Sequence, residues 1–230
     1  MTASLRHELR RAHAVAWKDL RSERRSLANF SGVLFLALLM LLLFAFALGP
    51  DAEAMRQAAA GIIWLAILFS GVLAFNRSYQ VELDDGAFET LLLYPGARWP
   101  IFAGKLAANL AFVLAVELVV VPLAAVLFHA SMTHAALNIA LVLLLGTFGF
   151  VTLGTFYAAV ASRTRAREVL LPLLLLPMLV PVLIAAAKAT TALTMGDVMG
   201  DTSSWVRLLL AFDLIFFTAS LAIYDVVITG

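Results

Sequence analysis

The sequence predicts an all-α protein that spans a membrane six times, and three observations lead to that prediction. Hydrophobic residues make up 63% of the 230 residues and charged residues only 13%, whereas soluble proteins are about half apolar and about a quarter charged. The apolar residues fall into six long runs separated by polar segments. The lysines and arginines concentrate in every second polar segment. Together these patterns are typical of a polytopic membrane protein.

The first 26 residues are basic and amphipathic. Apolar side chains such as Leu9 and Trp17 are interleaved, at roughly helical spacing, with Arg6, Arg10, Arg11, Lys18, Arg21, Arg24 and Arg25. This pattern predicts a helix that lies on the cytoplasmic membrane surface; the alternative is that the charges only set the topology. The segment is too charged to contain the apolar core of a cleavable signal peptide, so we expect the first apolar run to stay in the mature protein.

A helix needs about 20 mainly apolar residues to cross the hydrocarbon core of a bilayer. Six segments meet this requirement: 27–48, 58–75, 101–128, 134–161, 169–187 and 205–228. We therefore divide the chain into a cytoplasmic helix, 1–26, and a six-span transmembrane domain, 27–230.

The distribution of lysine and arginine predicts the orientation of the spans. Thirteen of these 16 residues lie in the first 26 residues, in the segments that follow the second and fourth spans or, for Lys105, at the start of the third span. The segments on the other side hold only Arg56, Lys188 and Arg207. Because basic residues favour the cytoplasmic side, both termini and the segment between the second and third spans are expected in the cytoplasm.

That segment is a polar insert, 76–104, and we interpret residues 76–100 of it as a coupling segment for a soluble partner. Asp85 and Gly86 form a turn signal, and a short helical stretch is expected between Glu89 and Pro95. Four of the chain's 15 acidic residues lie within eight positions here: Glu82, Asp84, Asp85 and Glu89. Such a helix can place an apolar face in a groove and its carboxylates against Arg or Lys of the partner. The alternative is a solvated loop without a partner.

Several spans contain residues that shape helix packing. Two sets of small residues predict close approach of a neighbouring helix: Ala107, Ala111 and Ala115 in the third span, and Gly146, Gly149 and Gly154 in the fourth. The fifth span contains Pro172, Pro177 and Pro181. Proline removes a backbone donor, so we expect this helix to kink or break.

Two carboxylates, Glu117 and Asp213, fall inside predicted spans. A carboxylate in hydrocarbon is costly, so each is expected to face the bundle interior, a cavity or a partner subunit. The alternatives are a hydrogen-bonded neutral carboxyl or a position nearer the interface. His129 and His134 flank the external loop between the third and fourth spans and are candidates for ligation of haem or a metal; interfacial polar side chains are the alternative. No metal site is predicted.

Catalytic motifs are not found. A Walker A loop requires G-x-x-x-x-G-K-[ST], and the nearest approach, Gly104-Lys105, lacks the first glycine and the hydroxyl. There is no cysteine, which excludes a disulfide framework and a thiolate metal site. We therefore expect no enzyme and no nucleic acid partner; the lipid bilayer is the one partner that composition predicts.

A string of motifs along nearly the whole chain resembles the haem exporter protein B family (CcmB), the permease subunit of the cytochrome c maturation ABC transporter. The motifs are Gly61-Ile62-Ile63-Trp64, the acidic pattern Glu82-x-x-Asp85-Gly86-x-x-Glu89 with Leu91, Leu93 and Pro95, then Gly104-Lys105, Leu143-Leu144-Leu145-Gly146-Thr147 and the proline-rich run Leu171 to Pro181. Their agreement in order makes the resemblance specific.

The resemblance implies a permease of the bacterial inner membrane that couples to a cytoplasmic ATPase (CcmA), which would bind ATP and Mg²⁺. It implies as further partners a haem-handling membrane protein (CcmC), a small single-span subunit (CcmD) and the periplasmic haem chaperone (CcmE). Haem is possible in that complex, and the coupling residues carried over by position are Glu82, Asp85, Gly86 and Glu89. The alternatives are a scaffold that transports nothing, or the permease of another ABC-2-type exporter. A transducer should require Glu117 or Asp213, whereas a scaffold should tolerate their amides.

Overall fold

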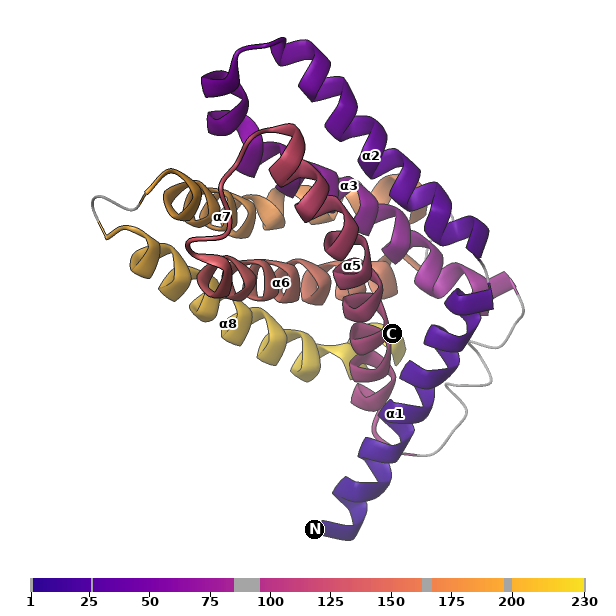
Figure 1. Cartoon of the computed structure of the whole chain (residues 1–230). Coiled ribbons are helices and arrows are strands. Elements are labelled where there is room, and N and C mark those ends of the chain that lie inside the picture. Colours follow the sequence, from indigo (N-terminus) through magenta and orange to yellow (C-terminus); the bar gives the residue numbers. More distant parts are fainter. Residues whose placement is uncertain (1, 26, 85–95, 163–166, 197–199, 230) are drawn as a thin grey trace.

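The computed structural model describes residues 2–25, 27–84, 96–162, 167–196 and 200–229. The described residues form helices joined by short connections, with no strand among them (Figure 1). In chain order the helices are α1 Thr2–Arg25, α2 Leu27–Leu48, α3 Ala52–Asp84, α5 Trp99–Leu127, α6 Ala136–Ser162, α7 Arg167–Met195 and α8 Thr202–Thr229. The all-α prediction is confirmed.

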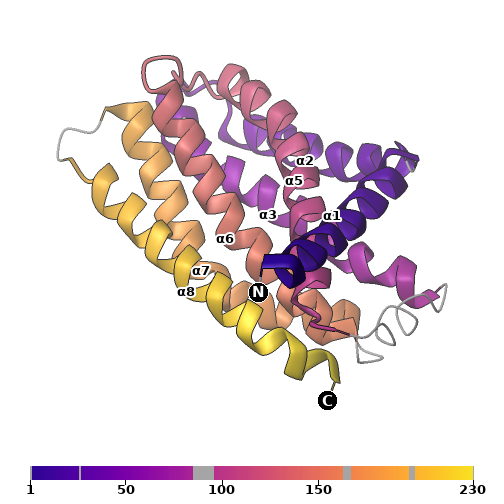
Figure 2. The same cartoon turned by 90° about the horizontal axis from the view of Figure 1, so that it is seen from below.

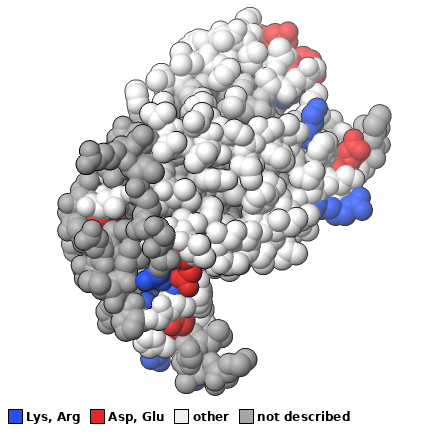
Figure 3. Space-filling model, turned by 180° about the vertical axis from the view of Figure 1, so that it is seen from behind, with Lys and Arg blue, Asp and Glu red and all other residues white. Residues whose placement is uncertain are grey.

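Six of these helices are long and apolar enough to cross a membrane. The candidate spans are Asn29–Leu48, Ala52–Gln80, Trp99–Leu127, Ala136–Ser162, Val169–Met195 and Thr202–Ile228. One face of the molecule has a broad surface without charge, and the Lys, Arg, Asp and Glu side chains visible on that face lie at its ends (Figure 3). The prediction of six spans is therefore confirmed.

The largest boundary error concerns the second span, for which 58–75 was expected. The helix begins at Ala52 because Asp51 Oδ1 accepts hydrogen bonds from the backbone N–H groups of Glu53 and Ala54, at 3.0 and 3.1 Å. At the other end the helix continues to Asp84, nine residues into the polar insert. Residues of this extension are buried in the bundle, which holds them helical where a separate cytoplasmic segment was expected.

The fifth span is one continuous helix, α7, with Pro172, Pro177 and Pro181 inside it. The expected break does not occur in this helix. Neighbouring helices pack against α7 on several sides, and α3, α6 and α8 all contact it. Such packing is what allows proline inside membrane-spanning helices.

α3 and α6 form the centre of the bundle (Figures 1 and 2). α3 is buried over most of its span, whereas α2 and α8 are largely exposed. α6 contacts α3, α5, α7 and α8. Trp64 Nε1 of α3 donates a hydrogen bond to Thr190 Oγ1 of α7 over 3.1 Å, both side chains being buried.

The glycines of α6 permit this close packing. A Cβ atom at Gly146 would overlap the Trp64 ring, one at Gly149 would overlap the Asp213 carboxylate, and one at Gly154 would overlap the Phe75 ring. The prediction for these glycines is confirmed.

The alanines of α5 behave differently. Ala107, Ala111 and Ala115 are all exposed. The buried residues of α5, such as Phe112 and Val116, lie at other positions of the helix, so close approach of a helix at these alanines stays a prediction.

α1 packs against α5, and its N-terminal end extends beyond the bundle (Figure 1). The contact is tight at Gly104, where an added Cβ would lie 2.6 Å from both Ala12 O and Val15 Cβ. Leu9 and Trp17 are on the exposed side of α1, at 52% and 58% exposure. The expected helix is therefore present, while its placement on a membrane surface stays a prediction.

Candidate functional site

The site begins at the last turn of α3, which contains the first residues of the polar insert. Glu82 was expected to be an exposed docking residue, but its side chain is only 5% exposed. Its carboxylate forms ion pairs with Lys105 Nζ of α5, at 2.8 Å, and with Lys18 Nζ of α1. This acidic residue therefore interacts inside the chain, and the partner role expected for it stays a prediction.

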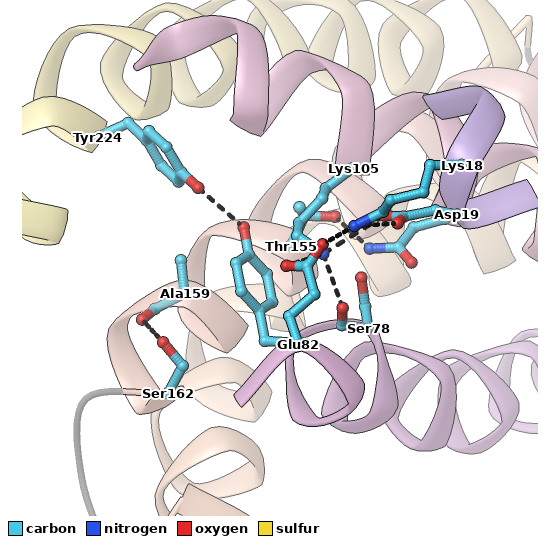
Figure 4. Close-up of polar contacts among 11 residues, drawn as sticks. Lys18, Asp19, Ser78, Glu82, Lys105, Thr155, Ala159, Ser162 and Tyr224 are labelled. Carbon is cyan, nitrogen blue, oxygen red and sulfur yellow. Dashed lines mark hydrogen bonds and ion pairs between the residues drawn. The ribbon is translucent and has the colours of Figure 1, made fainter. Parts of the chain in front are cut away.

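Lys105 is the most deeply buried charged residue of this site, with no exposed surface. Its Nζ donates a hydrogen bond to the Ser78 carbonyl oxygen over 2.7 Å, lies 3.3 Å from Asp19 Oδ2, and sits 4.5 Å from the centre of the Tyr79 ring (Figure 4). A buried ammonium group is stable only when it is paired and hydrogen-bonded. These contacts, together with Glu82, meet that requirement.

Lys18 and Asp19 bring α1 into the same set of interactions. Lys18 Nζ lies 3.2 Å from Asp19 Oδ1, and Asp19 also faces Lys105. Burial alone lowers the pKa of Lys18, but its hydrogen bond with Glu82 and the negative charges of Asp19 and Glu82 outweigh burial and raise that pKa. Lys18 is therefore a cation at neutral pH. We call Lys18, Asp19, Glu82 and Lys105 the charge cluster; its formal charges sum to zero.

Neutral hydrogen bonds extend the site to two further helices. Tyr79 and Tyr224 of α8 are buried, and their hydroxyl oxygens are 3.2 Å apart. Asn109 Nδ2 donates to Thr155 Oγ1 of α6 over 3.0 Å (Figure 4). The last turns of α3 are thus bonded to α1, α5 and α8, and Asn109 links α5 in turn to α6.

Sequence reasoning missed Lys105 as part of a site, because it was counted among the loop residues that set the topology. The signal was present: a single lysine follows Gly104 within the apolar run of the third span. A lone charge in that position must find a carboxylate, and Gly104 lets α1 approach closely enough for Asp19 to supply one.

The other predicted docking residues follow Glu82 in the chain. Asp84 ends α3, and only its place in the helix is described. Asp85, Gly86 and Glu89, with the short helix expected after them, lie outside the described residues. Their role in binding a partner remains a prediction.

Glu117 and Asp213 are buried, as expected, on two helices that pack against α6. Glu117 of α5 accepts a hydrogen bond from the hydroxyl of Thr147. Asp213 of α8 packs against Gly149, and neither of its oxygens has a hydrogen-bond partner among the described residues. The two carboxyl groups therefore contact α6 at positions only two residues apart, 147 and 149.

His129 and His134 lie in the connection between α5 and α6, and the backbone of His129 has a positive φ of 53°. Within the described ranges, no group of three His, Cys, Asp or Glu residues is placed to hold a metal ion. Ligation of haem by these histidines stays a prediction.

The fold and this site define an integral membrane protein with six spans and a polar junction at one end of the bundle. The chain belongs to the CcmB protein family, whose sequence profile matches residues 10–226.

Named relatives agree with this family. The chain is 33% identical over 164 residues to "Heme exporter protein B" of Rhodobacter capsulatus, covering 71% of this chain and 75% of the relative. The protein of that name from Haemophilus influenzae is 32% identical over 163 residues, covering 70% and 72%. The match to the Escherichia coli K12 protein of that name is 36% identical over 77 residues, covering 34% of this chain and 35% of the relative.

Proposed function

We propose that this protein is the permease subunit of an ABC transporter complex for haem export and cytochrome c maturation. Membership in the CcmB family and the names of its relatives support this function. The six candidate spans fit a permease. ATP binding and hydrolysis, with Mg²⁺, belong to a partner ATPase.

The partners that we propose are a CcmA-like ATPase in the cytoplasm, CcmC-like and CcmD-like membrane subunits, and a CcmE-like haem chaperone in the periplasm. The location that we propose is the bacterial inner membrane, with both termini in the cytoplasm because basic residues concentrate on that side. The natural absence of cysteine allows a direct test. A single cysteine replacing exposed His13 should react with a membrane-impermeant maleimide only after cell lysis, whereas one replacing Glu53 should react in intact spheroplasts; the reverse pattern would refute the orientation.

The charge cluster supports a coupling role for the insert. Glu82 is three positions before Asp85, and it binds lysines of α1 and α5 within the bundle. A partner that pulled or pushed on the insert would therefore act on three helices at once. We infer that the insert docks on the ATPase while Glu82 transmits its movement.

The docking test must leave Glu82 unchanged, because reversing it would place three lysine side chains together. We would compare the wild type with the Asp85→Lys, Glu89→Lys double variant. The control carries the same change of charge at the opposite end of the bundle, Glu53→Lys with Asp201→Lys; both of these side chains are exposed.

The readout is recovery of the ATPase with the permease from detergent-solubilised membranes. Loss of the ATPase from the double variant alone would support docking at the insert. Equal recovery from all three proteins would place docking elsewhere, on α1 or the loop after α6. If the wild type recovers no ATPase, the permease function itself is refuted, and a scaffold or an unrelated transporter becomes the better interpretation.

A further inference from the structure

The charges of α1 differ between its two sides. Its three carboxylates are partly buried, and each is bonded to a cation or an amide of the chain: Glu8 to Arg11, Asp19 to Lys105 and Glu23 to Asn29. Ala12 and Val15, which pack on Gly104, lie on the same side of the helix. The side of α1 that faces the bundle therefore holds all of its negative charge.

Three arginines are exposed on the opposite side, and they have no ion pair among the described residues: Arg6, Arg10 and Arg21. In an α-helix this spacing gives a row about 22 Å long that covers about 60° of the helix surface. Trp17 lies within the row and Leu9 beside it, at 58% and 52% exposure. We call Arg6, Arg10, Trp17 and Arg21 the basic stripe.

The contacts of α1 fix the height of the basic stripe relative to the spans. α1 ends at Arg25, and the first candidate span begins four residues later, at Asn29. The middle of α1 packs on Gly104 of α5, five residues after the third candidate span begins at Trp99. Both contacts are with the ends of spans. α1 therefore lies at the level of the lipid headgroups, beside the bundle.

The side chains of the basic stripe indicate what it contacts at that level. A guanidinium group can donate two parallel hydrogen bonds to a phosphate. Tryptophan is enriched where a membrane meets water, because its ring is apolar and its N–H is polar. A lipid surface satisfies both kinds of side chain. Because no carboxylate balances the three arginines, the stripe attracts a headgroup with a net negative charge more than a zwitterionic one.

We propose that the basic stripe binds anionic phospholipid headgroups, with phosphates at its three arginines and the Trp17 ring at the start of the acyl chains. The stripe thereby concentrates an anionic lipid such as phosphatidylglycerol beside α1. Lipid bound on this side holds the other side, with Lys18 and Asp19 of the charge cluster, against α3 and α5. This surface needs only a bilayer, so it does not depend on the proposed transport function.

The test measures quenching of Trp17 fluorescence by brominated lipids, with the full-length protein reconstituted in bilayers. Each bilayer contains equal amounts of phosphatidylglycerol and phosphatidylethanolamine, and only one of the two lipids carries bromine near the start of its acyl chains. The signal of Trp17 is the difference between the wild type and Trp17→Phe. Brominated phosphatidylglycerol should quench it more strongly. That preference should disappear in about 1 M salt, where the screening length is about 3 Å.

The triple variant Arg6→Gln, Arg10→Gln, Arg21→Gln tests the arginines directly. Glutamine and arginine have similar helix propensities, so α1 should stay helical. Each arginine near an anionic surface contributes about fivefold to binding. Loss of all three should therefore reduce the preference of Trp17 for phosphatidylglycerol by at least about tenfold.

The matched control removes three exposed cations from the opposite end of the bundle, with Arg56→Gln, Lys188→Gln and Arg207→Gln. Its net charge equals that of the first triple variant, so it should keep the wild-type preference if position matters and not charge alone. A preference reduced equally in both triple variants would contradict the proposal.

The wild type alone can also overturn the proposal, whatever the folding of the variants. Equal quenching of Trp17 by the two brominated lipids would show that the stripe does not select anionic headgroups. A preference that persists in high salt would show that it does not act through charge. If neither lipid quenches Trp17, the stripe does not lie on the membrane, and an acidic protein surface becomes the better interpretation.

Discussion

Buried carboxylates occur in two regions of this protein, and their surroundings differ. At the end of α3, Glu82 is 5% exposed and pairs with two lysines. Within the spans, Glu117 and Asp213 are equally buried, at 4% and 6% exposure, but they have no ion pair among the described residues. The same chemical group thus has a cationic partner in one region and a hydroxyl, or no partner, in the other.

Because of this difference, the two regions contribute differently to the stability of the fold. In the charge cluster, the buried charges of Glu82 and Lys105 are stable only because they are paired, so the cluster joins α1, α3 and α5 and loss of either charge is strongly destabilising. Glu117 has one hydrogen bond, which an amide can also accept, and Asp213 has no hydrogen bond among the described residues. Function should therefore be separable from stability within the spans and difficult to separate from it in the charge cluster.

Removing the buried cation should have the largest effect. Lys105→Met leaves Asp19 and Glu82 with only the half-exposed Lys18, so we expect a loss of about 3–5 kcal/mol of stability. Thermal unfolding of the detergent-solubilised protein measures it. The double variant Lys105→Met, Glu82→Gln removes one charge of each sign and should lose less than the two single variants summed. Unfolding of Lys105→Met at the wild-type temperature would show that the cluster does not stabilise the fold.

Separating α1 from α5 should disturb the charge cluster without changing any charge. In Gly104→Ala the new methyl group meets Ala12 O and Val15 Cβ, so α1 must shift and Asp19 must move away from Lys105. We expect a loss of about 1–3 kcal/mol and faster tryptic cleavage at Arg10 and Arg11. Gly61→Ala is the control, since an added Cβ there meets nothing within 4 Å. Equal cleavage of the two variants would contradict this account of the contact.

Amide substitution within the spans should have the smallest effect on stability. In Glu117→Gln the amide oxygen can still accept the Thr147 hydrogen bond, and Asp213→Asn disrupts no hydrogen bond among the described residues. We expect each to change stability by less than about 1 kcal/mol. Two measurements on each variant test the comparison: thermal unfolding and complementation of c-type cytochrome synthesis. Loss of complementation in a variant of unchanged stability supports a transducer. Full complementation by both variants supports a scaffold. A large loss of stability in either variant would show that Glu117 or Asp213 stabilises the fold as the charge cluster does, and would contradict the comparison.

The six spans and the helical N-terminal segment were predictable because each depends on local properties of the sequence. The length of an apolar run is enough to identify a span. The glycines of α6 indicate close helix packing even when the neighbouring helix is unknown. The family could likewise be suggested from motif order. The site was predicted only in part: Glu82 was singled out, but as a docking residue, and Lys105 was counted as a loop charge.

Composition, span number and the presence of an acidic segment after the second apolar run were determined by the sequence by itself, since hydrophobicity and charge are properties of short segments. Only the tertiary structure decided which charges meet. Lys18 and Glu82 are 64 positions apart and Lys105 and Asp19 are 86 apart, and no local pattern reports such a distance. Whether a carboxylate faces a lysine of its own chain or a partner depends on how helices pack, and here the packing of α1 and α5 beside α3 brings Lys18 and Lys105 to Glu82.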